Sequence, residues 1–223
     1  MKIVSINVGR PRLCSYNGET FSTSIFKEPV AGRVMLRRTN LDGDRQADLS
    51  VHGGPNKTVY GYPAEHYAYW RDELRLETLP RGSLGENFTT EGLLEKDVHV
   101  GDRYRIGAAT VKVTTPRLPC FKLAAKFKRD DMIERFLHSG WSGYYFSVVE
   151  EGEVGAGDEF EFLGGETATL SIFDTFAAYT SLDLDLLQRA AAVKALPESW
   201  RERFQMRADA IHKAAIERNS AVR

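Results

Sequence analysis

A cysteine placed among prolines and cations is the strongest chemical signal in this sequence. Cys120 follows Pro116 and Pro119 and lies between Arg117 and Lys122, in the stretch TTPRLPCFK. Prolines hold the backbone stiff, and the two cations favour a thiolate over a thiol. If Pro119 occupies the first position of a helix, the helix dipole stabilises the same negative charge. The pattern predicts a prepared sulfur ligand or nucleophile; the alternative is a buried packing cysteine.

A histidine followed by two glycines forms a second candidate, in the stretch DLSVHGGPNKTVYGY at residues 48–62. Gly53 and Gly54 let the backbone approach a ligand closely, and Lys57 supplies a cation. The spacing of a phosphate-binding P-loop is missing. The alternative is a hairpin turn with His52 at the end of a strand.

Two further glycine-containing stretches are candidate ligand loops. In GSLGENFTTEGL we expect Glu86 and Asn87 to project from a turn, where an amide could donate to and accept from the edge of a heteroaromatic ring. In HSGWSGYYF, Ser139 and Gly140 begin a loop that carries hydroxyl and indole donors. Each stretch could equally be a turn that leads into a strand.

Several other kinds of site are excluded by spacing. The sequence has no C-x-x-C or H-E-x-x-H pattern for zinc, no G-x-S-x-G elbow and no G-x-G-x-x-G after a strand. A net charge of -1 gives no global reason to expect binding to DNA or to a membrane surface. Any anionic ligand must therefore be met by a local cluster of cations.

The cysteine content and the lack of long apolar runs indicate a cytoplasmic protein. The chain has two cysteines, Cys14 and Cys120, which are too few for a disulfide scaffold and fit a reducing compartment. Cys14 lacks the setting of Cys120 and is interpreted as incidental. The start of the chain has no signal-peptide core, and no apolar run approaches the roughly 20 residues that span a bilayer.

Short strands separated by glycines are expected from residue 1 to about residue 164. Alternation is clearest at residues 104–107, 110–114 and 144–149. This spacing predicts a mainly β domain built as a bent or closed antiparallel barrel. One helix is expected at residues 63–74, and another is expected to begin near Pro119.

Helical patterns replace the strands over residues 165–223. The sequence Thr180–Asp183 is typical of a capping box, with apolar residues following at helical spacing. Pro197 restarts a helix in which Trp200 and Phe204 lie on one side, and this apolar stripe is predicted to face the protein core. The division is therefore a β domain at 1–164 and a helical segment at 165–223.

Four stretches taken together resemble a known family. These are DLSVHGGPNKTVYGYPAEHYAYW, GSLGENFTTEGL, VTTPRLPCFKLAAKF and SGWSGYYFSVVEEGEVGAGDEFE. In this order and spacing they resemble the MOSC domain family, and most closely its stand-alone bacterial YiiM-like branch, which has a three-helix C-terminal segment. The resemblance implies a barrel like that of pyruvate kinase and a molybdenum cofactor, Mo-molybdopterin. It also implies reduction of N-hydroxylated compounds such as hydroxylaminopurines.

The resemblance assigns the molybdenum ligand to Cys120, where a soft deprotonated sulfur suits such a metal. His52 or Asn87 would supply a proton or orient the N–OH group of the substrate. The remaining expected residues line the cofactor site: Gly53, Gly54, Lys57, Glu86, Arg117, Lys122, Ser139 and Gly140.

Turnover then requires a partner, because no flavin, NAD or iron–sulfur motif is visible. We expect a separate reductase, a flavin or iron–sulfur protein, as electron donor, and a small-molecule substrate rather than a nucleic-acid polymer. A carrier of the cofactor or of sulfur without reductase activity is the alternative. A cofactor-free enzyme with Cys120 as nucleophile and His52 as base is a further one. The helical tail could cover the barrel, pair two subunits in a homodimer or dock the reductase.

Overall fold

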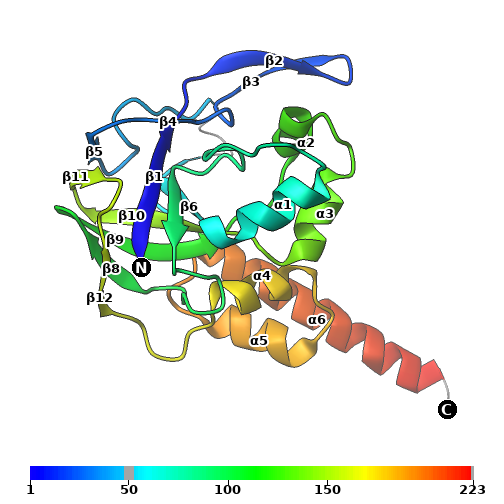
Figure 1. Ribbon diagram of the computed structural model, residues 1–223. Coiled ribbons are helices and arrows are strands. Elements are labelled where there is room, and N and C mark those ends of the chain that lie inside the picture. The colour runs from blue at the N-terminus through cyan, green and yellow to red at the C-terminus, as the bar shows by residue number, and fades with distance from the viewer. Residues whose placement is uncertain (48–52, 222–223) are drawn as a thin grey trace.

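The computed structural model describes residues 1–47 and 53–221 (Figure 1). The strands are β1 (Lys2–Val8), β2 (Arg12–Tyr16), β3 (Glu19–Thr23), β4 (Glu28–Pro29), β5 (Arg33–Leu36), β6 (Val59–Pro63), β7 (Phe88–Glu91), β8 (Arg103–Ile106), β9 (Ala109–Pro116), β10 (Tyr144–Glu150), β11 (Gly152–Gly155) and β12 (Phe160–Gly164). The helices are the short 3-10 helix η1 (Ala64–His66), α1 (Tyr67–Glu73), α2 (Phe121–Phe127), α3 (Met132–Ser139), α4 (Ile172–Thr180), α5 (Leu184–Ala192) and α6 (Glu198–Ala221).

One large sheet organises the first part of the chain, in the strand order β12-β8-β9-β10-β6-β7-β1-β4. The two ends of this sheet approach each other: Phe160 N–H donates to the Met1 carbonyl at 3.0 Å, and Ile3 N–H donates to Asp158 at 2.9 Å. The strands expected at residues 104–107, 110–114 and 144–149 are confirmed as β8, β9 and β10. The expectation of a mainly β chain is therefore confirmed.

The expected antiparallel barrel is only partly right. The described residues form a large mixed sheet, and no closed barrel is found among them. The exception to antiparallel pairing is β6 beside β7, which run parallel with Gly61 opposite Phe88. Parallel neighbours need a crossover connection, and η1 and α1 provide it here. The sequence pattern gave no sign of this pairing, because alternation along a strand does not reveal the direction of its neighbour.

The hairpin β2–β3 stands apart from the large sheet, above α2 in Figure 1. Its turn is Asn17-Gly18, and both residues have positive φ angles, 49° and 82°, as the tight turn of a hairpin requires. The hairpin is held against the helices by an edge contact between the Phe21 and Phe121 rings, whose centroids are 4.8 Å apart. The Asn17 side chain also donates to Asp130 at 3.1 Å.

Two helix predictions can be compared directly with the structure. The helix expected at residues 63–74 is confirmed as η1 and α1, with Trp70 fully buried. The second helix begins later than expected: Cys120 is the residue that precedes the first turn of α2, and Phe121 is the first helical residue. Pro119 therefore lies outside the helix, because the backbone at Cys120 is extended (φ -134°, ψ 168°).

Three helices, α4, α5 and α6, fill the end of the chain and gather below the sheet in Figure 1. The capping box expected at Thr180–Asp183 is wrong: Asp183 itself caps α5 through its side chain. A similar arrangement occurs one helix earlier, where the Ser171 hydroxyl accepts from Asp174 N–H at 2.9 Å at the start of α4. Pro197 does precede a helix, α6, as expected.

The helical segment shares its core with the sheet. Leu187, Ala190 and Phe204 are fully buried in the cluster that contains Val111 and Phe146 of β9 and β10. The core position of the α6 stripe is thus confirmed for Phe204 and for Ala208, whereas Trp200 is half-buried. The boundary drawn after residue 164 stays a prediction. Among the described residues no helix is long and apolar enough to cross a membrane.

Candidate functional site

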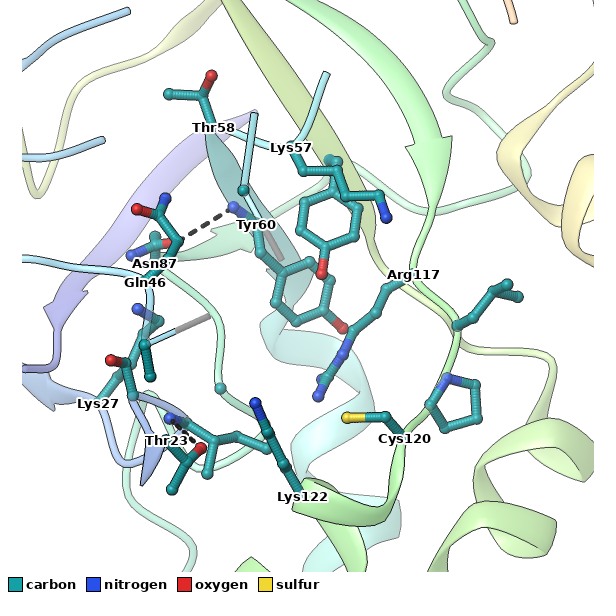
Figure 2. Close-up of a pocket in the computed structure, with 18 of the residues that line it drawn as sticks. Thr23, Lys27, Gln46, Lys57, Thr58, Tyr60, Asn87, Arg117, Cys120 and Lys122 are labelled. Atoms are coloured by element: carbon teal, nitrogen blue, oxygen red, sulfur yellow. Dashed lines mark hydrogen bonds between the residues drawn. The ribbon is translucent and has the colours of Figure 1, made fainter. Parts of the chain in front are cut away.

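A pocket of about 540 Å³ collects most of the chemically notable side chains (Figure 2). Its walls come from the end of β3 and the segment after it, residues 44–47 and 53–60, the segment before β7, the loop between β9 and α2, β10, and the C-terminal helices. The expected site residues that line it are Gly53, Lys57, Asn87, Arg117, Cys120 and Lys122. Others line it without having been predicted: Lys27, Asp44, Tyr60, Tyr145, Tyr179 and Trp200.

Cys120 presents its sulfur to this pocket. The side chain is half-buried and does not cap α2, because it makes no hydrogen bond to the first turn of the helix. Figure 2 shows the sulfur directed to the space between the Arg117 and Lys122 side chains. The local cause is the stiff Arg117–Pro119 loop, which leaves β9 at Pro116 and turns the chain into α2.

Arg117 is a buried cation that the protein holds by several contacts. It donates to the Leu84 carbonyl, and its guanidinium lies 4.8 Å from the centre of the Tyr60 ring and 5.6 Å from that of Phe136. Burial lowers the pKa of Arg117, but attraction to the Tyr60, Tyr145 and Cys120 side chains outweighs it and raises the pKa overall. Arg117 is therefore a fixed positive charge beside the sulfur.

Lys122 is a buried cation of a different kind. Its side chain lines the pocket and is 8% exposed, yet it has no hydrogen-bonding or ionic partner among the described residues. Its Nζ is not among the fully buried polar atoms that lack a partner, so the ammonium reaches the open pocket. Lys122 is therefore available to contact an anionic ligand in the pocket.

Lys27 and Asp44 form an ion pair in the pocket lining, with Nζ and Oδ1 2.6 Å apart and both side chains almost fully buried. Burial lowers the pKa of Lys27, while Asp44 opposes that shift. Nearby, Lys126 donates to the carbonyls of Ile25 and Gly82, both at 2.9 Å. Burial, the largest cause, lowers the pKa of Lys126 to about 7. Among the described residues that line the pocket, Asp44 is the single carboxylate, so the site favours a negatively charged ligand; the cations of the lining are Lys27, Arg45, Lys57, Arg117 and Lys122.

Asn87 lines the pocket, but its amide is occupied by the protein. It donates to Asp44 at 2.9 Å and to the Asn7 carbonyl at 3.2 Å, and it accepts from Tyr60 N–H at 3.2 Å, the bond dashed in Figure 2. These three bonds tie β6 to β1 and to the segment that carries Asp44. Asn87 therefore braces the wall, and its role toward a substrate stays a prediction.

Glu86 does not project from its turn, so that expectation is wrong. The side chain is fully buried and does not line the pocket. One oxygen accepts from Gly82 N–H and from the Thr89 hydroxyl, both at 2.8 Å, and from the Tyr67 hydroxyl. Glycine-rich turns often expose side chains, but here tertiary partners on α1 and β7 draw the carboxylate inward.

Tyr145 contributes a phenol to the pocket, a role that its place in an alternating strand pattern did not indicate. Its ring centroid lies 5.3 Å from that of Tyr60, and its hydroxyl has no hydrogen-bond partner among the described residues. Tyr60 differs, because its hydroxyl donates to the Ser142 carbonyl at 2.8 Å. Burial raises the pKa of both phenols. Tyr145 thus remains protonated at neutral pH and presents a donor to the pocket.

The loop from Ser139 to Gly143 lies elsewhere. The Ser139 hydroxyl donates to the Phe136 carbonyl and accepts from Trp141 N–H, and these bonds lie at the end of α3. Gly140 has the positive φ (70°) of a residue that follows a helix. Neither residue is part of the pocket lining, and Gly54 is not either. His52 falls outside the described residues. The proposed roles of these four residues stay predictions.

Trp141 belongs instead to a buried polar group that we call the His66–Glu95 cluster, made of His66, Glu95, Trp141 and Gly143. His66 Nε2 lies 2.8 Å from one Glu95 oxygen, and Gly143 N–H donates to the other at 2.8 Å. The Trp141 ring stacks on His66 with centroids 4.3 Å apart and planes 4° apart. Both carboxylate oxygens therefore have partners, and the cluster does not line the pocket.

The chain is similar to several known proteins. The model of the MOSC domain family matches residues 48–161. YflK of Bacillus subtilis is 40% identical over 93% of this chain and 94% of its own length. YiiM of Escherichia coli is 35% identical over 83% of this chain and 84% of its own. A protein of Gibberella moniliformis named reductase is 32% identical over 72% of this chain, which corresponds to 29% of its own length.

A solved structure agrees with the sequence matches. The crystal structure of YiiM from Geobacillus stearothermophilus superposes with a TM-score of 0.77 at 34% identity, and the match covers 93% of this chain and 98% of that chain.

Proposed function

Because the chain belongs to the MOSC domain family, we propose that its pocket holds a molybdenum cofactor and reduces N-hydroxylated compounds, with Cys120 as the protein ligand to molybdenum. The main support for this proposal is that the Cys120 sulfur faces a pocket that is also lined by Lys122, a cation without a partner among the described residues. The name of the Gibberella relative, a reductase, supports a redox reaction.

The residues present fit Mo-molybdopterin. A terminal phosphate needs cationic donors, and Lys122 and Lys57 line the pocket without an ionic partner among the described residues. A soft thiolate suits molybdenum, and Arg117 and Lys122 stabilise negative charge on the Cys120 sulfur by Coulomb attraction. The cavity of about 540 Å³ is within the usual size range of cofactor sites.

The overall reaction consumes two electrons and two protons, and it converts the N–OH group into N–H with release of water. The bound cofactor supplies the oxygen-atom and electron transfer. In this proposal the Tyr145 hydroxyl, which lines the pocket and stays protonated at neutral pH, is the proton donor to the substrate. Asn87 is less suited to this role, because both ends of its amide are bonded to the protein. For His52 the role stays a prediction.

Electrons come from a separate reductase in this proposal. The sequence carries no flavin, NAD or iron–sulfur motif, so the pocket must be reduced by a flavin or iron–sulfur partner. An artificial electron donor can replace that partner in an assay.

The test is to produce the protein in a host that makes the cofactor and to measure molybdenum per chain and reduction of 6-hydroxylaminopurine. Cys120→Ser should lose both, because a neutral hydroxyl is a poor ligand for a soft metal. Cys14→Ser, which changes the thiol on β2 outside the pocket, is the matched control and should keep both. A Cys120→Ser protein that retains metal and turnover would contradict the ligand assignment. Metal-loaded wild-type protein that reduces no N-hydroxylated compound would instead indicate a carrier.

A further inference from the structure

The pocket has two chemically different walls, and one of them comes from the C-terminal helices. Lys27 and Lys122 give the first wall its positive charge, and Figure 2 shows both on one side of the Cys120 sulfur. The second wall contains Leu118, Tyr179 and Trp200, which are apolar or aromatic. The positive charge of the first wall suits the anionic cofactor of the proposed function. The second wall has no ligand assigned to it so far.

The position of the second wall follows from the packing of α4. This helix contacts β9, whose end continues into the loop that carries Arg117 and Cys120. Tyr179 lies at the last turn of α4, and Trp200 lies in the first turn of α6. Their ring centroids are 6.0 Å apart with planes tilted by 49°, so the two rings form an angled aromatic surface.

Contacts from α6 hold these rings in place. The Arg203 guanidinium covers one side of Tyr179, 4.4 Å from the ring centre, and the Phe204 ring packs at the edge of Trp200, with centroids 5.8 Å apart. Arg207 donates to the carbonyls of Tyr179 and Ser181 and so fixes the end of α4 against α6. A surface held in this way binds a rigid ligand with little loss of conformational freedom.

Trp200 differs in burial from Phe204 and Ala208, which lie on the same stripe of α6. Phe204 is 0% exposed and Ala208 is 2% exposed, as expected of residues that only pack the core. Trp200 is half-buried and keeps part of its surface in the pocket. Its indole N–H and the Tyr179 hydroxyl have no hydrogen-bond partner among the described residues, so both can serve the edge of a ligand.

We propose that Tyr179 and Trp200 form the subsite that binds the planar nitrogen heteroaromatic ring of the substrate, so that the C-terminal segment selects ring-bearing N-hydroxylated compounds over small aliphatic ones. This inference rests on the proposed function. Stacking on aromatic side chains suits any flat heterocycle, and the two polar atoms suit a ring with nitrogen donors and acceptors at its edge. An aliphatic N-hydroxylated compound gains neither contact.

The first measurement is binding of adenine, a ring without an N–OH group, to the molybdenum-loaded protein by calorimetry. Trp200→Leu keeps apolar contact with Phe204 but removes the aromatic face, and it should raise the Kd about tenfold. Trp200→Phe retains a ring and should change the Kd by less than about threefold. Trp141→Leu is the matched control, because that tryptophan stacks on His66 outside the pocket lining, and it should leave the Kd unchanged.

The second measurement is the preference for a ring, taken as kcat/KM for 6-hydroxylaminopurine divided by kcat/KM for acetamidoxime. Trp200→Leu should lower this ratio about tenfold, whereas Trp141→Leu should not change it. Wild-type protein that reduces neither compound but binds adenine through Trp200 would contradict the proposed reaction and support the subsite. If the wild-type enzyme is active but Trp200→Leu changes neither the adenine affinity nor the ratio of the two kcat/KM values, the subsite proposal is wrong. If adenine binds only to molybdenum-free protein, the subsite proposal is also wrong, because Tyr179 and Trp200 would then contact the cofactor instead of the substrate.

Discussion

The Cys120 pocket and the His66–Glu95 cluster both bury charged or polar side chains, but they treat them in opposite ways. In the cluster, each Glu95 oxygen has a partner at 2.8 Å and Trp141 covers the imidazole of His66. In the pocket, Lys122 is equally buried and lines a cavity without a partner among the described residues. The difference teaches that burial of charge does not by itself identify a functional site: in the pocket, the charged side chain without a partner also lines an open cavity.

The largest effect should come from breaking the cluster. Glu95→Ala removes the acceptor of both His66 and Gly143 N–H, and we expect it to lower the free energy of unfolding by about 3 kcal/mol. Molybdenum per folded chain should not change, because Glu95 lies outside the pocket lining. Urea unfolding and metal analysis measure the two quantities.

Glu134→Ala is the control for this experiment, since its side chain is 74% exposed, and it should change stability by less than about 0.5 kcal/mol. If Glu95→Ala lost metal while its stability stayed at the wild-type level, the cluster would have to be counted as part of the functional site.

A change in the pocket should have the reverse signature. Lys122→Met removes a buried charge that has no partner, so the free energy of unfolding should stay the same or rise by up to about 1 kcal/mol. Molybdenum per chain should fall about tenfold, since a charge-assisted hydrogen bond to an anion contributes about 1.5–3 kcal/mol. Lys128→Met, at the exposed end of α2, should alter neither quantity. A Lys122→Met protein that is destabilised by more than about 1 kcal/mol would show that the lysine has a structural role and would remove the contrast with the cluster.

A third effect concerns pH. Burial lowers the pKa of Lys126 from its ordinary value of 10.5 to about 7. Between these two values the unfolded chain binds more protons at this group than the folded chain, so folding stability rises with pH over that interval. The contribution of neutral Lys126 to the free energy of unfolding is fully present above pH 10.5 and is lost as the pH falls through about 7.

Urea unfolding at several pH values between 7 and 9.5 tests this prediction. Lys126→Met should show a smaller increase in stability with pH than wild-type protein, and Lys194→Met, an exposed lysine, should show the wild-type slope. Equal slopes in all three proteins would mean that the Lys126 ammonium keeps its charge in the fold.

The sequence was most informative where short-range chemistry decides the structure. The strands β8, β9 and β10 follow from alternation, and the helix at residues 63–74 follows from the spacing of its buried aromatic residues. The sequence motif also identified Cys120 and its neighbours Arg117 and Lys122, because their positions depend on a stiff loop of a few residues. Local pattern and local geometry agree in these segments.

Long-range features could not be predicted in the same way. Lys27 meets Asp44 only because the sheet folds, and neither residue has a telling neighbour in sequence. Glu86 reads as a turn residue, yet Tyr67 and Thr89 draw it inside. Trp200 fits a core stripe by spacing, but spacing does not reveal that part of its surface lies in a cavity. Pairing across the chain decides each of these cases.

The pairing of β1 has a consequence for how the protein folds. Strand β1 pairs with the nearby β4, but its other sheet partners lie far along the chain, at residues 88–91 of β7 and at the backbone around Asp158 and Phe160. Without those distant residues, Ile3, which is buried in the folded protein, has no sheet partner. Folding of the large sheet therefore depends on contacts between residues far apart in the sequence, which form slowly and leave apolar strand edges exposed in the meantime.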